Sequence, residues 1–325
     1  MIDDFNRKID YLRLSVTDRC NLRCTYCMPA EGIRMLDRAQ LLSAEEIIKT
    51  VGILSRLGFR KIRLTGGEPL VRKDIITIIE GIKAIGPIED ISITTNGVLL
   101  KRFLKDLYRL GTKRINISID SLDENNYSRI TRGGLLGKVL EALDESIMMG
   151  FGPIKINTVI TSGFNLDDAR SFIEMSEKKP VFIRFIERMH IPGLETGSYQ
   201  KESGIKQVNL DDIFRFMTSR ALYRRIKGPQ GFGPAAYYRK SGSTGSIGFI
   251  KISKDRCKRC NRIRLTSRGT LKRCLFSGKE LDIKKELRKG RGPDTIIKMV
   301  SEYIKGKPDY RDHTNIQDSM NMIGG

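Results

Sequence analysis

The chain has 325 residues, of which 39% are hydrophobic and 30% charged, a composition typical of folded proteins rather than disordered ones. Its N-terminus lacks the apolar run of a signal peptide, and no stretch approaches the roughly 18 apolar residues of a membrane span, so we expect a cytoplasmic protein without a membrane partner. The net charge of +21 predicts an anionic partner, such as a polyphosphate or a nucleic acid.

Strands and helices alternate in the first 190 residues. Between the strands, apolar residues recur at helical spacing, and the capping-box pattern of Ser43 and Glu46 predicts where the first helix begins. Strands that alternate with helices of this length indicate βαβ units and a parallel sheet. The expected strands are residues 11–16, 61–64, 91–93, 114–119, 154–160 and 181–186, and the expected helices 43–58, 74–86, one ending at Gly111, 135–149 and 166–178.

Polar segments follow the first four predicted strands. They are a cysteine-containing loop, then residues 66–69, 94–97 and 118–120. Parallel sheets bind their ligands at the carboxyl ends of the strands. We therefore expect these segments to meet at one rim and to form a binding site.

The regular alternation ends near residue 190, which predicts two domains, residues 1–190 and residues 191–325. The second begins with a loop-like stretch and carries a short helix near 209–218. Three β-like runs follow at 221–226, 235–240 and 247–252, and a last helix is expected near 294–305.

The six cysteines form two groups of three: Cys20, Cys24 and Cys27, then Cys257, Cys260 and Cys274. A structural zinc site needs four ligands, so one zinc ion would leave two cysteines unused. Two iron–sulfur clusters would use all six and leave each cluster one iron open to a substrate or cofactor. Zinc at either group stays an alternative. Basic residues near the first group, such as Arg19 and Arg23, are expected to favour its metal-binding thiolate form.

The C-x3-C-x2-C spacing of the first group, with Tyr26 before its last cysteine, resembles the radical S-adenosylmethionine (SAM) superfamily, as does the Gly-Gly-Glu-Pro segment 66–69. The resemblance implies a [4Fe-4S] cluster on the first group, whose fourth iron chelates SAM. Reduction then yields a 5′-deoxyadenosyl radical. It also implies an α/β fold, a partial (β/α)6 barrel, here with a C-terminal β-rich extension carrying a second cluster.

Further motifs at residues 13–19, 27–29, 64–69, 94–97, 116–121 and 257–264, with the terminal Gly324-Gly325, resemble the GTP 3′,8-cyclase family. The resemblance implies GTP as substrate and a 3′,8-cyclo-dihydro-GTP as product, in the first step of molybdenum cofactor biosynthesis. The second cluster would hold the guanine ring. The implied partners are an electron donor, the next enzyme of the pathway (cyclic pyranopterin monophosphate synthase) and a second copy of the chain.

The same resemblance assigns roles to individual residues. Arginine suits a triphosphate because it forms bidentate, charge-assisted hydrogen bonds. From their alternation with apolar residues alone, Arg13 and Arg63 would be solvent-facing strand residues. Thr95 stays an alternative to Thr94 as a GTP contact. The implied SAM contacts are Tyr26, Gly67, Ser118 and Met189; the GTP contacts are Arg13, Arg63, Thr94, Lys155, Arg262, Ile263 and Arg264; the catalytic set is the first three cysteines with Arg262 and Arg264.

Two other functions compete with this interpretation. A radical enzyme that matures peptides or modifies RNA would share the first motif, but peptide-maturing relatives carry more C-terminal cysteines. A zinc-dependent nucleic-acid-binding protein is favoured by residues 251–275, which hold ten Lys or Arg and one acid. However, the chain has no tryptophan and no clustered aromatics for base stacking, so we predict no nucleic-acid partner.

Overall fold

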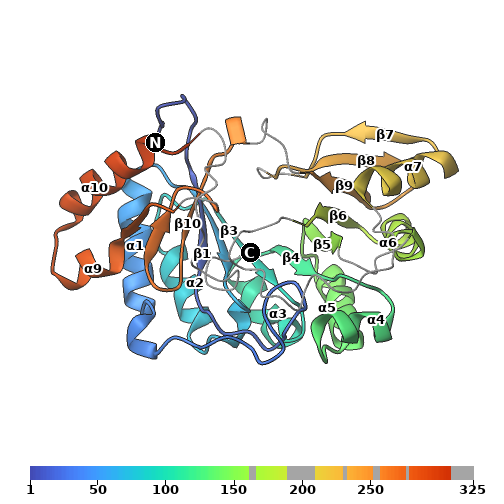
Figure 1. The fold of residues 1–325 in the computed structure, drawn as a ribbon, viewed down its shortest axis with the longest axis horizontal. Helices are drawn as coiled ribbons and strands as arrows, with labels where there is room; N and C mark the ends of the chain where they lie inside the picture. Colours follow the sequence, from blue (N-terminus) through green and yellow to red (C-terminus); the bar gives the residue numbers. More distant parts are fainter. Residues whose placement is uncertain (161–165, 189–208, 230–232, 252–256, 276–277, 309–325) are drawn as a thin grey trace.

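A twelve-stranded sheet forms the centre of the chain (Figure 1). The computed structural model describes residues 1–160, 166–188, 209–229, 233–251, 257–275 and 278–308. The strand order is β12-β11-β10-β1-β2-β3-β4-β5-β6-β9-β8-β7.

The first six strands are neighbours in chain order and pair in parallel. The mixed α/β fold with a large parallel sheet is therefore confirmed, and the strand bounds agree with the predicted ones to within about two residues. The strands are β1 (Tyr11–Ser15), β2 (Lys61–Thr65), β3 (Asp90–Thr95), β4 (Arg114–Ser118), β5 (Ile154–Ile160) and β6 (Val181–Glu187); the predicted helices are α1 (Ala44–Arg56), α2 (Ile75–Lys83), α3 (Leu100–Arg109), α5 (Leu136–Met148) and α6 (Leu166–Lys178).

The expected β-rich extension is present, but its strands join the first six in one sheet. β10 (Arg262–Leu265) pairs in parallel with β1, and antiparallel β11 (Thr270–Lys272) and β12 (Glu280–Asp282) follow it. On the opposite edge, β9 (Ser246–Ile250) pairs in parallel with β6, followed by antiparallel β8 (Ala236–Lys240) and β7 (Tyr223–Ile226). The C-terminal region thus extends both edges. The domain boundary at residue 190 lies outside the described residues and stays a prediction.

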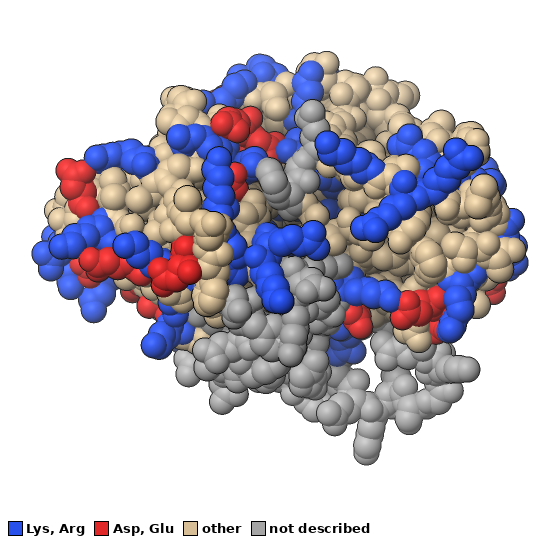
Figure 2. Space-filling view, turned by 90° about the horizontal axis from the view of Figure 1, so that it is seen from above, with Lys and Arg blue, Asp and Glu red and all other residues tan. Residues whose placement is uncertain are grey.

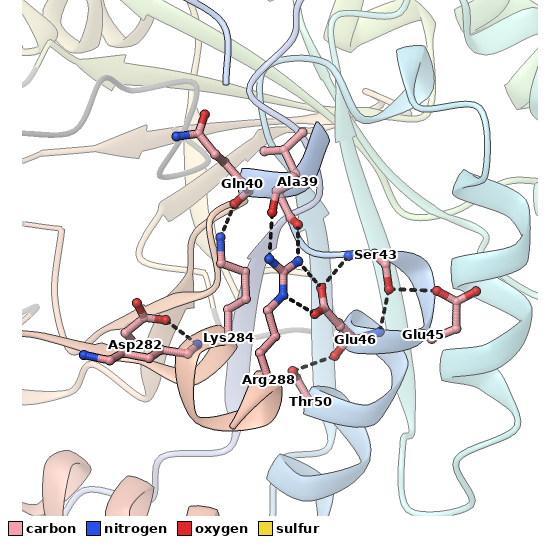
Figure 3. A network of polar contacts seen from close by, with 11 residues as sticks. Ala39, Gln40, Ser43, Glu45, Glu46, Thr50, Asp282, Lys284 and Arg288 are labelled. Carbon is pink, nitrogen blue, oxygen red and sulfur yellow. Dashed lines mark hydrogen bonds and ion pairs between the residues drawn. The ribbon is translucent and has the colours of Figure 1, made fainter. Parts of the chain in front are cut away.

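The C-terminal helices also contact the N-terminal half. α7 (Leu210–Arg220) lies beside α6, whereas α9 (Ile283–Arg288) and α10 (Pro293–Lys305) pack against α1 (Figure 1). Figure 3 shows the contact at the start of α1: Arg288 forms an ion pair with Glu46 at 2.7 Å and donates to the carbonyl of Ala39. Glu46 also completes the predicted capping box with Ser43. These contacts fix the segment that follows the first cysteine group.

Four short helices in the described residues were not predicted: α4 (Glu124–Thr131), α9 and the 3-10 helices η1 (Arg38–Gln40) and η2 (Pro69–Val71). α4 has the sequence ENNYSRIT, and its buried residues Tyr127, Ile130 and Thr131 lie at helical spacing, but they span little more than one turn, which is too short a pattern to predict a helix. Its start is fixed instead by the side chain of Asp123, which accepts a hydrogen bond from the backbone of Asn126 at 2.7 Å.

The two faces of the sheet differ in polarity. One face carries buried Ile, Leu, Val and Phe side chains that pack against the helices. Side chains alternate between the two faces along each strand, and residues in register on neighbouring strands share a face. The residues that alternate with these apolar ones therefore all point to the opposite face. That second face is polar and basic, with Arg13, Arg63, Thr94, Asn116 and Lys155 on it.

Positive charge on the exterior is not confined to one place. Figure 2 shows Lys and Arg side chains spread over the face seen from above, with Asp and Glu among them. In the described part of the chain, no helix is both long enough and apolar enough to cross a membrane.

Candidate active site

The first cysteine group lies on the loop after β1, and the segment after β2 packs directly against it. Gly67 donates its N–H to the carbonyl of Thr17 at 2.9 Å. A Cβ on Gly67 would lie 2.3 Å from the carbonyl oxygen of Arg19, too close for any side chain. Glycine is therefore required at 67, because the two backbones touch where the cysteine loop begins.

Glu68 connects the ends of β2 and β3. Its carboxylate accepts hydrogen bonds from the hydroxyl of Thr95 at 2.7 Å and from the backbone of Asn96 at 2.6 Å. Burial raises the pKa of Glu68 to about 7. Asn96 in turn reaches the cysteine loop, where its amide lies 3.8 Å from the sulfur of Cys20. The predicted meeting of these segments at one rim is thus observed.

α4 holds the cysteine loop from the other side. The carbonyls of Thr131 and Ile130 accept from the backbone N–H groups of Arg23, at 3.1 Å, and Thr25, at 2.8 Å. Arg132 follows α4 in a left-handed conformation (φ 54°) that costs a residue with a side chain about 1–2 kcal/mol. Its guanidinium donates to the carbonyls of Arg23, at 3.1 Å, and Met28, at 2.9 Å, and so bridges the two ends of the loop.

Tyr26, between the last two cysteines, is held by the end of β4. Its hydroxyl donates to Asp120 at 2.6 Å, and the other carboxylate oxygen accepts from the backbone of Val159 at 2.9 Å. Burial raises the pKa of Asp120 to about 6, so the carboxyl is ionised in most molecules at pH 7.5. The sequence analysis included Asp120 in the rim segment 118–120 but gave it no role, although it follows Asn116 and Ser118 at the period of two that marks one face of a strand.

The two cysteine groups differ in electrostatics. Burial raises the pKa of Cys20 to about 11 and that of Cys27 to about 12. The expectation that nearby arginines favour these thiolates is therefore wrong for the protein without metal, since Arg19 and Arg23 are exposed. At Cys260 burial also raises the pKa, but the charges of Lys307 and Arg262 outweigh it and lower the pKa to about 6.

All six cysteines are free. In the described ranges, no group of three or more His, Cys, Asp or Glu side chains lies close enough together to hold one metal ion. Three thiols within eight residues, on a loop whose backbone packs directly against Gly67, suit an iron–sulfur cluster that leaves one iron open.

Three arginines lie side by side on the polar face of the sheet. Arg264 of β10 is in register with Arg13 of β1, which is in register with Arg63 of β2. Neighbouring strands are only about 4.8 Å apart. Burial and the charges of Arg264 and Arg63 lower the pKa of Arg13. A bound anion would relieve this repulsion.

Lys155 and Arg184 continue the basic surface on β5 and β6. Both are buried, with 4% of each residue exposed. Burial, followed by the charge of Arg184, lowers the pKa of Lys155 to about 7. Arg184 donates to Asn116 at 2.9 Å, while its Nε has no partner among the described residues. Sequence reasoning missed Arg184. A single charged residue between Ile183 and Phe185, in a strand that is otherwise apolar and buried, is a signal that could have marked it as a candidate binding residue.

Two basic residues near the starts of β2 and β4 have acidic partners. Lys61 pairs with Asp10 at 3.0 Å, and Arg114 pairs with Asp90. Farther along, none of Arg63, Lys155 and Arg184 forms an ion pair with an acidic side chain of the described residues. The middle of the polar face therefore carries positive charge that the described acids do not neutralise.

The remaining predicted residues fall in different places. Thr94 points to the polar face and accepts from Asn116 at 3.3 Å, whereas Thr95 is bound to Glu68, so the geometry favours Thr94 as a ligand contact. Ser118 and Arg262 lie on the polar face by register, through partners Asn157 and Tyr11. Ile263 is buried in the apolar core, which leaves only its backbone available to GTP. Met189 and Gly324-Gly325 lie outside the described residues.

The fold and the cysteine loop define a radical SAM protein. The Radical SAM superfamily matches residues 14–175, and the family described as Molybdenum Cofactor Synthesis C matches residues 181–313. Among solved structures, SuiB of Streptococcus suis bound to S-adenosylmethionine is similar with a TM-score of 0.60 and 15% identity, covering 86% of this chain and 64% of that chain. At this identity the similarity shows the fold.

Curated relatives show which family within this superfamily the chain belongs to. The GTP 3′,8-cyclase of Thermodesulfovibrio yellowstonii is 46% identical over 328 residues, and that of Pelotomaculum thermopropionicum 41% identical over 331 residues. Each alignment covers 100% of both chains. The chain belongs to the GTP 3′,8-cyclase family.

Proposed function

We propose that this chain converts GTP to (8S)-3′,8-cyclo-7,8-dihydroguanosine 5′-triphosphate, the first step of molybdenum cofactor biosynthesis. The observation that carries the proposal is the basic surface of Arg63, Lys155 and Arg184, which form no ion pair with an acid of the described residues, on the sheet whose rim bears the first cysteine group. A triphosphate supplies the negative charge that such a surface requires. The names of the curated relatives support the same activity.

The proposed cofactor site divides between the two cysteine groups. Cys20, Cys24 and Cys27 would hold a [4Fe-4S] cluster and Cys257, Cys260 and Cys274 a second one. The proposed SAM contacts are Tyr26, Gly67, Ser118 and Met189. When reduced, the first cluster with SAM supplies a 5′-deoxyadenosyl radical.

The proposed GTP contacts orient the substrate on the polar face. Arg13, Arg63 and Lys155 would bind the phosphates, Thr94 adds a hydroxyl, and the 262–264 segment follows the second cysteine group. Burial of these groups excludes water, which protects a radical from side reactions. The reaction removes hydrogen from C3′ of the ribose and joins C3′ to C8 of guanine. One electron and one proton must then reduce the radical that this step leaves on the guanine ring.

That electron balance requires an electron donor as a partner. We also propose that cyclic pyranopterin monophosphate synthase takes the product, that two copies of the chain associate, and that residues 1–190 and 191–325 are its two domains. A cytoplasmic setting suits six free thiols, which stay reduced there.

Two measurements test the proposal. Anaerobic reconstitution should load about eight irons per chain, as expected for two [4Fe-4S] clusters. Zinc with little iron would contradict the cofactor assignment. The reduced protein should then form 5′-deoxyadenosine from SAM only when GTP is present, with ATP as the matched control. Formation that does not depend on GTP would refute the substrate.

A further inference from the structure

Asp120 lies between two elements that carry proposed SAM contacts. It follows β4 two residues after Ser118 and is buried, with 3% of the residue exposed. One carboxylate oxygen accepts from the hydroxyl of Tyr26 at 2.6 Å, and the other accepts from the backbone of Val159 at 2.9 Å. Asp120 therefore joins the cysteine loop to the ends of β4 and β5.

Both carboxylate oxygens of buried Asp120 are used in hydrogen bonds. An apolar side chain of similar size would leave the Tyr26 hydroxyl and the Val159 N–H without this partner, and an unsatisfied buried polar group is costly. The carboxylate instead makes a short, charge-assisted hydrogen bond to the one aromatic side chain of the loop.

We infer that Asp120 is a positioning residue for SAM: it anchors the ring of Tyr26 and so fixes the loop between Cys24 and Cys27 relative to Ser118. Tyr26 and Ser118 belong to different elements but are proposed to contact the same cofactor. Asp120 sets their separation because it bonds to one and follows the other in β4. The inference rests on the proposed SAM site.

Substitutions on both sides of the hydrogen bond test the inference. Tyr26→Phe removes one hydroxyl and keeps the ring, while Asp120→Asn keeps the size and removes the charge. The full chain, reconstituted anaerobically, is assayed for iron content, for SAM affinity from the change in the electron paramagnetic resonance spectrum of the reduced cluster, and for KM against kcat. Each variant should keep its iron and bind SAM about 10-fold more weakly, as expected for one charge-assisted hydrogen bond.

The double variant decides whether the two residues act through each other. It should bind SAM no more weakly than the weaker single variant, because both substitutions remove the same bond. Tyr127→Phe is the matched control, since Tyr127 is a buried tyrosine of α4 whose hydroxyl has no partner among the described residues. This control should bind SAM as the wild type does.

Each contrary result has a distinct meaning. If wild-type protein does not bind SAM, the proposed function fails, whatever the variants do. If wild type binds SAM and Tyr26→Phe binds it equally well, Asp120 has no positioning role, and this holds even when Asp120→Asn fails to fold. Effects that multiply in the double variant, an equal loss in Tyr127→Phe, or loss of iron without loss of SAM affinity would also overturn the inference.

Discussion

Lys155 should make GTP binding depend on pH in a way that arginine at the same position would not. Its pKa in the free protein is about 7, because burial and the charge of Arg184 disfavour the protonated form. A bound triphosphate favours that form instead. Binding above pH 7 must therefore take up a proton, and the affinity must fall as pH rises.

The size of the effect follows from the pKa. With a value of about 7, the lysine is protonated in roughly nine molecules in ten at pH 6 and roughly one in ten at pH 8. If only the protonated form binds the phosphate, affinity falls about tenfold between these two pH values. Lys155→Arg keeps a charge that does not titrate in this range. The phosphates of GTP titrate identically in both experiments, so the ratio of the two affinities isolates Lys155.

Calorimetry with both clusters loaded, without reductant or SAM, measures the affinities and the protons. At pH 8 the heat of binding in buffers of different ionisation enthalpy should show uptake of about one proton by the wild type and none attributable to residue 155 in Lys155→Arg. Equal pH slopes for the two proteins would refute the reasoning, because Lys155 would then be either charged throughout or remote from the phosphates.

Two further predictions concern the cysteine loop. Gly67→Ala should prevent loading of the first cluster, because its Cβ would lie 2.3 Å from a backbone oxygen; Gly52→Ala, with nothing within 4 Å, is the control that should load fully. Normal iron content in Gly67→Ala would show that the loop can shift. Arg132→Gly and Arg132→Ala both remove the two bonds that bridge the loop, so a chelator should extract iron several-fold faster from each. Only the glycine variant also relieves about 1–2 kcal/mol of left-handed strain, so it should unfold at higher denaturant than the alanine variant.

Periodicity predicted the first half of the fold well because local signals were strong there. Alternating residues defined the strands, and Ser43 with Glu46 marked the start of α1 as the structure has it. The pairing of β10 with β1 joins residues some 250 positions apart. Periodicity within a window carries no information about such a partner, so the sequence indicated β-structure in the C-terminal region without indicating where it pairs.

The candidate site was predictable to the extent that motifs marked it. Cysteine spacing and the Gly-Gly-Glu-Pro segment located the rim. The alternation of Arg13 with Leu12 and Leu14 fits a solvent-exposed face and an enclosed polar face equally well, and only the sheet distinguishes the two. Arg132 could not be predicted, because the helix before it has only eight residues and a left-handed conformation is uncommon for a residue with a long side chain.

The placement of the C-terminal strands has a consequence for synthesis on the ribosome. β1 emerges early, yet its outer edge stays unpaired until β10 follows about 250 residues later, roughly 10–50 s at usual elongation rates. An open strand edge invites pairing with other chains. Inward-pointing charges on such a strand discourage that pairing, and Arg13 is one of them. We therefore expect the arginine proposed to hold a triphosphate in the finished protein also to discourage aggregation of the unfinished chain.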